Sequence, residues 1–126
     1  MPITRVICGE HLTDAEREII SELLHDCLVT EFAVPPDDKF QIFEQLSDHR
    51  RIANPHYLSK GRSAGFILFQ VTAGKPRSSE QKQRFYRALS DGLKAKAGIS
   101  PEDVMVTLQF NQAEDWSFSK GEKFGL

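Results

Sequence analysis

The chain has 126 residues, a length typical of one domain, and 40% of them are hydrophobic, enough for one modest core. Its formal net charge is −2, which argues against non-specific nucleic-acid binding but leaves room for a small anionic substrate. No apolar run has the length of a signal peptide or of a membrane span. We therefore expect a soluble cytoplasmic protein with no membrane partner.

The chain opens with MPITRV, in which a proline follows the initiator methionine. Inside a chain, proline has no acid–base chemistry, but removal of Met1 would give Pro2 a free secondary amine. The ordinary pKa of an α-amino group is about 7.7–8.0, and a nearby cation or an apolar pocket would lower it. Pro2 would then be a neutral base near the optimum for proton transfer at physiological pH. Many chains have proline at this position without using it.

Two similar units organise the sequence, and each is predicted as strand, helix, strand. In the first unit, a short β-branched run at 3–8 precedes a helix with one apolar face, and the strand-like run KFQIFEQL follows. In the second unit, the apolar run AGFILFQVTA is typical of a strand buried on both faces, and a second amphipathic helix follows it. The run VMVTLQF at 104–110 then alternates in polarity.

Helix-capping and strand-start signals at corresponding positions support a duplication. Capping boxes begin both predicted helices, Thr13 with Glu16 and Ser78 with Gln81, 65 residues apart. An aspartate precedes the last strand-like run of each unit, at positions 37 and 103, which are 66 residues apart. Two signals at nearly one offset indicate a duplicated unit.

These elements predict an α+β fold of order β-α-β-β-α-β, with two pseudo-symmetric units in one four-stranded sheet and both helices on one face. Helix-length crossovers imply parallel strand pairs within each unit. Apolar residues on both faces of the third strand favour association of subunits. We expect a single domain over 1–126, made of unit one at about 2–46, a connecting loop at about 47–62, unit two at about 63–110 and a tail at about 111–126.

The same order of elements occurs in ferredoxin-like domains, including RNA-recognition modules. The segment RSAGFILF at 62–69 fits their first RNA-binding signature in part. Ala64 stands where a stacking aromatic is required, and the first strand, ITRVIC, has no aromatic for the companion signature. A phenylalanine-rich core strand explains the segment, so nucleic acid is not an expected partner.

Candidate chemistry outside Pro2 begins with GKPRSSEQK at 74–82, where a strand ends and a capped helix begins. Lys75 and Arg77 flank a proline there, and a helix N-terminus itself favours anions. The pair is a candidate carboxylate clamp, although a solvated basic turn is the commoner explanation. The acidic pair Asp37 and Asp38 in PPDD has turn formation as its ordinary explanation.

The cysteines and histidines predict no metal site. Cys8 and Cys27 have neither a CxxC spacing nor a metal-ligand pattern, and Cys27 falls on the apolar helix face, which indicates buried free thiols. The four histidines are scattered, and we assign none to a site. His25, on the flank of the first helix, is the one to watch. We expect no metal and no organic cofactor.

Pro2 and several segments together resemble the tautomerase superfamily, whose members use an amino-terminal proline and contain two β-α-β units. Within it, the sequence is most similar to malonate semialdehyde decarboxylase and its relatives. The matching segments are TEFAVPPDDKFQ, GRS, KPRSSEQKQRFY, GISPEDVMVTL and EDWSF. They run in order over nearly the whole chain, and GISPEDV and DWSF are the specific ones. The resemblance implies a homotrimer with Pro2 at the floor of each active site.

The resemblance also implies roles for single residues. Pro2 would be the general acid/base, and Asp38 would work with it and orient water or substrate. Arg77 would hold the substrate carboxylate. Lys75 stands where the decarboxylases carry a second arginine, and lysine keeps the charge but lacks the planar fork.

Trp116 and Phe118 match an apolar wall of the pocket in the same family, although by themselves they would be packing residues. We expect a proline-based tautomerase that transfers a proton between the enol and keto forms of 2-keto acids such as phenylpyruvate. One alternative is a decarboxylase or hydratase of 3-oxo or unsaturated acids, which Lys75 disfavours. The other, from a different class, is a binding protein for small acids that keeps the fold but has no turnover.

Overall fold

A computed structural model describes residues 1–125. The strands and long helices follow in the order β1 (Pro2–Gly9), α1 (Asp14–Phe32), β2 (Gln41–Leu46), β3 (Ile67–Ala73), α2 (Ser79–Ala97) and β4 (Val104–Phe110). Short 3-10 helices are η1 (Asp48–Arg50), η2 (Pro101–Asp103) and η3 (Ala113–Asp115). The predicted order β-α-β-β-α-β is confirmed. Within residues 1–125, no helix is long and apolar enough to cross a membrane.

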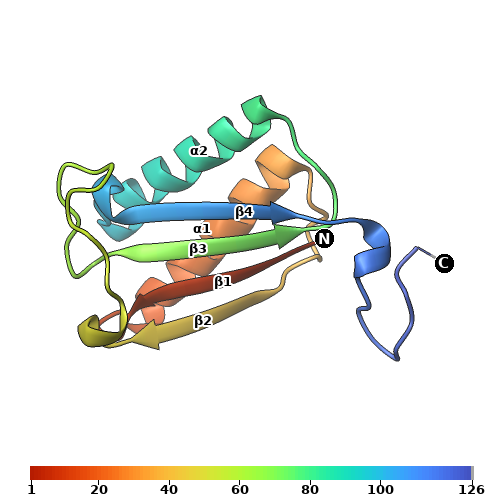
Figure 1. Cartoon of the computed structure of the whole chain (residues 1–126), viewed down its shortest axis with the longest axis horizontal. Helices are drawn as coiled ribbons and strands as arrows, with labels where there is room; N and C mark the ends of the chain where they lie inside the picture. Colours follow the sequence, from red (N-terminus) through yellow and green to blue (C-terminus); the bar gives the residue numbers. More distant parts are fainter. Residues whose placement is uncertain (126) are drawn as a thin grey trace.

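The four strands form one mixed sheet in the order β2-β1-β3-β4. Strands within a unit are parallel, β1 with β2 and β3 with β4, as the helical crossovers predicted. The central pair, β1 with β3, is antiparallel, so Pro2 at the start of β1 lies opposite Ala73 at the end of β3. Both helices cover one face of this sheet (Figure 1). The two units therefore begin their strands at opposite ends of the sheet.

Local sequence explains where the helices begin and end. Both predicted capping boxes form, since the Thr13 and Ser78 hydroxyls each accept a hydrogen bond from the backbone N–H three residues later at 3.1 Å. α2 ends at Gly98 in the left-handed conformation that glycine favours, with φ 66°. α1 ends at Ala33 in the same conformation, with φ 54°.

The core lies between the helices and the covered face of the sheet. Its fully buried members come from both units and include Val6, Cys8, Ile20, Leu24, Phe32, Ile67, Phe69, Phe85, Leu89 and Leu93. Both cysteines are free and buried, as predicted. Burial raises the pKa of the Cys27 thiol to about 11.

The open face of the sheet differs from one expectation. The third strand reads as buried on both faces, but within one chain only Ile67, Phe69, Val71 and Ala73 are buried, beneath the helices. The alternate residues Leu68, Gln70 and Thr72 are half-buried on the open face. On neighbouring strands of this face, Ile42 is 50% and Met105 is 46% exposed. The open face therefore mixes apolar and polar side chains.

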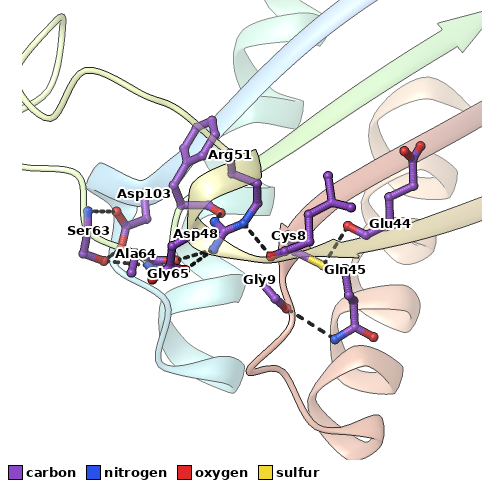
Figure 2. Close-up of polar contacts among 12 residues, drawn as sticks. Cys8, Gly9, Glu44, Gln45, Asp48, Arg51, Ser63, Ala64, Gly65 and Asp103 are labelled. Carbon is purple, nitrogen blue, oxygen red and sulfur yellow. Dashed lines mark hydrogen bonds and ion pairs between the residues drawn. The ribbon is translucent and has the colours of Figure 1, made fainter.

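Arg51 ties the segment between the units to the sheet. Its buried guanidinium pairs with Asp48 at 2.8 Å (Figure 2). The same group donates to three backbone carbonyls, each at 3.0 Å, those of Leu46, Ala64 and Phe66. A charged donor that satisfies several carbonyls fixes this segment although little of it is helix or strand.

A second polar contact closes the same end of the sheet, where β3 and β4 begin. Asp103, 5% exposed, accepts hydrogen bonds from the backbone N–H and the hydroxyl of Ser63, each at 2.6 Å (Figure 2). Gly65 N–H in turn donates to the Ser63 hydroxyl at 3.0 Å. Both oxygens of this buried carboxylate therefore have protein donors, and Asp103 has a structural role.

Candidate active site

The opposite end of the sheet carries a cavity of about 560 Å³. The start of β1, the turn before β2, the segment after β3 and the C-terminal tail meet there, and Figure 1 shows the N-terminus and the tail at this end. The cavity is lined by Met1, Phe32, Ala33, Pro35, Asp37, Asp38, Phe40, Lys75, Arg77, Phe118 and Phe124. The structure thus brings Asp38, Lys75, Arg77 and Phe118 to one cavity, beside the amino terminus.

Met1 occupies part of this site. Its ammonium nitrogen lies 2.7 Å from Asp38 Oδ2, and both side chains are mostly buried, 17% and 15% exposed. The Met1 carbonyl accepts a hydrogen bond from the Gly74 N–H at 3.1 Å. While Met1 is present, the nitrogen of Pro2 is a peptide nitrogen without a proton or basicity. Pro2 itself is buried, and it is not among the residues that line the cavity while Met1 is present.

Gly74 is required for this close approach. A Cβ at this position would lie 2.5 Å from Met1 Cε and 2.7 Å from Trp116 Nε1, too close for either neighbour. The absence of a side chain lets the first residue and the tail pack against the end of β3.

Asp38 keeps one carboxylate oxygen free. Its Oδ1 is buried and has no hydrogen-bond partner within residues 1–125, whereas both oxygens of Asp103 are satisfied. A buried acceptor without a donor is costly, and such groups are found where a ligand, water or proton completes the site. Of these two aspartates, one in each unit, Asp38 is the one whose carboxylate keeps an oxygen without a donor among residues 1–125.

Arg77 is held in place by the end of α1. Its guanidinium donates to the carbonyl of Phe32 at 2.8 Å and to that of Lys75, and it lies 5.2 Å from the centre of the Phe32 ring. The Phe32 carbonyl belongs to the end of α1, where the helix dipole is negative and favours a cation. Burial lowers the pKa of Arg77 from its ordinary value, yet arginine stays protonated in proteins. Its remaining N–H groups make no hydrogen bond within residues 1–125. Lys75 is exposed at the rim.

The tail supplies an aromatic wall centred on Phe118. The Phe118 ring lies 5.8 Å from Phe40, 5.4 Å from Phe124 and 5.5 Å from Trp116, on which it stacks. The Trp116 indole donates to Asn111 Oδ1 at 2.6 Å, and Phe124 N–H donates to the Trp116 carbonyl at 2.9 Å. These bonds fold the tail back over the site, so that Phe118 faces the cavity and Trp116 lies behind it.

Several residues of the site were not predicted from the sequence. Phe40 was assigned only to a strand, although its alternation with Ile42 places both away from the helices. Phe32 and Phe124 also line the cavity, and no sequence pattern had marked either as a site residue. The unassigned His25 lies with its Nε2 2.7 Å from the Pro36 carbonyl, close to Asp38 in the chain. Within residues 1–125, no group of three or more histidine, cysteine, aspartate or glutamate side chains could hold a metal ion.

Comparison with known families identifies the class. The model of the family described as "Tautomerase enzyme" matches residues 38–119, and the chain belongs to this family. It is an enzyme of the tautomerase superfamily, as the resemblance implied.

Particular relatives match along nearly the full length. The chain is 32% identical to the probable tautomerase YusQ of Bacillus subtilis, over 96% of this chain and 95% of that protein. Its fold matches a crystal structure of malonate semialdehyde decarboxylase with a TM-score of 0.89 and 34% identity, covering 95% of this chain and 92% of the other. FG41 malonate semialdehyde decarboxylase gives a TM-score of 0.88 at 30% identity, covering 95% and 91%.

Proposed function

We propose that this enzyme is a proline-based tautomerase that interconverts the enol and keto forms of 2-keto acids such as phenylpyruvate. The observation that carries the proposal is the contact between the amino terminus and Asp38, 2.7 Å, at the edge of a cavity that also holds Arg77. A base, a carboxylate and an anion-binding cation within one pocket suffice for proton transfer next to a carbonyl.

Removal of Met1 is the first requirement. It converts the Pro2 nitrogen into a secondary amine beside Asp38, and it vacates part of the cavity for substrate. It also removes the acceptor of the Gly74 N–H. That backbone donor then becomes available to a substrate oxygen near the amine.

Substrate binding follows from the charges and the aromatic wall. The carboxylate binds the free N–H groups of Arg77, with Lys75 as a second cation at the rim. The side chain of the substrate packs on Phe118 and Phe40, which are 42% and 48% exposed and hence open to contact. A flat, apolar side chain such as phenyl suits this wall.

Proton transfer then uses Pro2 alone or with Asp38. In the ketonisation direction, the enol oxygen loses a proton and the neighbouring carbon gains one. The Pro2 amine takes the proton from the enol oxygen and then gives a proton to the neighbouring carbon. The cations stabilise the negative charge that develops on the enolate oxygen. Asp38 orients the amine or a water through its carboxylate. This sequence of steps needs no metal or organic cofactor.

A decarboxylase or hydratase of 3-oxo or unsaturated acids is the second candidate. The 34% identity and TM-score of 0.89 to malonate semialdehyde decarboxylase favour it. Lys75 counts against it because a lysine cannot form the planar, two-point contact of an arginine. A binding protein without turnover would need none of the amine chemistry.

We also propose a homotrimer. The half-apolar open face of the sheet, with Ile42 and Met105 about half exposed, supports burial against other subunits. A more distant structural relative, at 20% identity, is described as a symmetric fused 4-OT trimer. Light scattering on the purified enzyme should give about three times the 14.3 kDa of one chain, and a monomer would contradict the assembly.

The test is the ketonisation of phenylenolpyruvate, followed by ultraviolet absorbance. Protein whose first residue is Pro2, verified by mass spectrometry, is compared with Pro2→Ala and with a 3-oxo acid as alternative substrate. We expect a fast rate that collapses in Pro2→Ala. Equal rates in both proteins would overturn the tautomerase, and turnover of the 3-oxo acid alone would establish the decarboxylase.

A further inference from the structure

The turn that carries Asp38 is held by one histidine of α1. His25 Nε2 lies 2.7 Å from the carbonyl oxygen of Pro36, two residues before Asp38. We propose that His25 is a positioning residue that holds the Asp38 carboxylate against the Pro2 amine, an inference that rests on the proposed function.

The chemistry of this contact fixes the direction of the hydrogen bond. A carbonyl oxygen only accepts, so Nε2 of His25 must carry the hydrogen. The neutral ring with its proton on Nε2 and the imidazolium both meet this requirement. The contact is therefore a hydrogen bond that His25 donates to the turn.

The turn has few other ties. Pro35 and Pro36 have no N–H, and the bonds from Asp38 N–H to the Pro35 carbonyl and from Lys39 N–H to the Asp37 carbonyl, both 3.0 Å, stay inside the turn. The chain is anchored on either side of the turn. Before it, the N–H of buried Val34 donates to the Leu28 carbonyl, and after it, the Thr4 N–H donates to the Phe40 carbonyl.

Between these anchors, residues 1–125 offer two contacts from the rest of the chain to the turn's polar groups, His25 on Pro36 and the Met1 ammonium on Asp38. Removal of Met1 breaks the second. Once Met1 is removed, the bond from His25 is, among residues 2–125, the one that joins the turn's polar groups to a helix.

Asp38 needs such a tie. Its buried Oδ1 has no partner among the described residues, so the carboxylate gains hydration if the turn moves outward. Exposure would separate Asp38 from Pro2, while the carboxylate anchor Arg77, which is fixed to Phe32, would stay in place. Loss of the His25 bond should therefore reduce turnover and leave substrate affinity nearly unchanged.

The experiment compares His25→Leu, which removes the donor, with His25→Gln, whose amide nitrogen can reach the same carbonyl. His56→Leu is the matched control, since His56 is exposed in the segment between the units. We expect His25→Leu to lower kcat by about tenfold with KM within about twofold, and His25→Gln and His56→Leu to stay near the parent. Equal kcat in His25→Leu and the parent, or equal losses in the Leu and Gln variants, would overturn the proposal.

A double-mutant cycle tests whether His25 acts through Asp38. In an Asp38→Asn background, His25→Leu should change kcat by less than about twofold, because the residue that it positions is already disabled. Losses that multiply independently would contradict a positioning role. Melting temperatures of all variants separate this effect from unfolding.

Crystal structures of the parent and His25→Leu, both without Met1, give a readout that does not depend on turnover. We expect the turn at 35–38 to shift or lose order in His25→Leu and to return in His25→Gln. An unmoved turn would overturn the inference even for an active enzyme. A moved turn in a protein without tautomerase activity would instead sink the proposed function and leave the structural tie intact.

Discussion

Arg77, before α2, donates a hydrogen bond to the carbonyl of Phe32 at the end of α1, 2.8 Å away. The contact joins the two β-α-β units at the edge of the cavity. It also means that the cation proposed to bind substrate is held by the fold before any substrate arrives. Arg77 therefore makes a structural contact besides its proposed contact with substrate, and its substitutions should separate the two.

Arg77→Lys tests the anchor. Lysine keeps the charge but cannot donate to the Phe32 carbonyl and to a substrate carboxylate with the same fixed geometry. We expect KM for a 2-keto acid to rise about tenfold with a smaller change in kcat. In Arg77→Met, loss of the hydrogen bonds should lower the free energy of unfolding by about 1–2 kcal/mol, measured by urea denaturation. Unchanged KM in both variants would place the carboxylate elsewhere.

An N-terminal extension tests the need for a free proline. A tag fused before Pro2 keeps its nitrogen in a peptide bond, so we expect no turnover above background from a protein with a native circular dichroism spectrum. Cleavage that leaves Pro2 as the first residue should restore the rate. The cleavage reaction is its own control, because fold and sequence after residue 2 are identical. Activity in the intact fusion would exclude the amine as catalyst.

Lys75→Arg tests the balance between reactions. Arginine would add a second planar donor beside Arg77 and strengthen the hold on a developing enolate. We expect decarboxylation of a 3-oxo acid to rise severalfold relative to ketonisation, with both rates measured on the same preparation. Lys75→Met, which removes the charge, should lower both. A ratio that does not change in Lys75→Arg would show that residue 75 does not select the reaction.

Phe118→Ala tests the aromatic wall. The substitution removes the ring that lies between Phe40 and Phe124, and about 1 kcal/mol of aromatic contact is lost from a bound phenyl group. We expect kcat/KM for phenylenolpyruvate to fall about fivefold to tenfold. The value for pyruvate enol, which has no ring, should fall much less. Equal losses for both substrates would mean that the wall only supports the fold.

Cys27 predicts a pH dependence of stability. Its pKa is raised from 9.0 to about 11 by burial, so the folded protein keeps the thiol proton at pH values where the unfolded chain loses it. The contribution is fully present below pH 9 and is lost as the pH rises through about 11. The free energy of unfolding should therefore fall less steeply between these values in Cys27→Ala than in the parent. Parallel curves for the two proteins would contradict the shift.

The sequence by itself determined the order of elements, because each signal was local. Apolar periodicity and the capping boxes at Thr13 and Ser78 depend on residues within a few positions of each other. Helical crossovers of this length then left little choice but parallel pairs within each unit. The candidate residues Pro2, Asp38, Lys75 and Arg77 were also found in the sequence, although mainly through resemblance to a family.

Only the tertiary structure decided which of these residues meet. The antiparallel pairing of β1 with β3 brings the end of β3 to the start of β1, so that Gly74 bonds to Met1 across 73 positions of chain. The same topology separates Asp38, with its free oxygen, from Asp103, which Ser63 satisfies. The place of Phe40 in the cavity lining and the hydrogen bond from His25 to Pro36 could not be predicted from the sequence either. Such contacts depend on strand register and on where a turn lies above a helix, and no local pattern of residues encodes either.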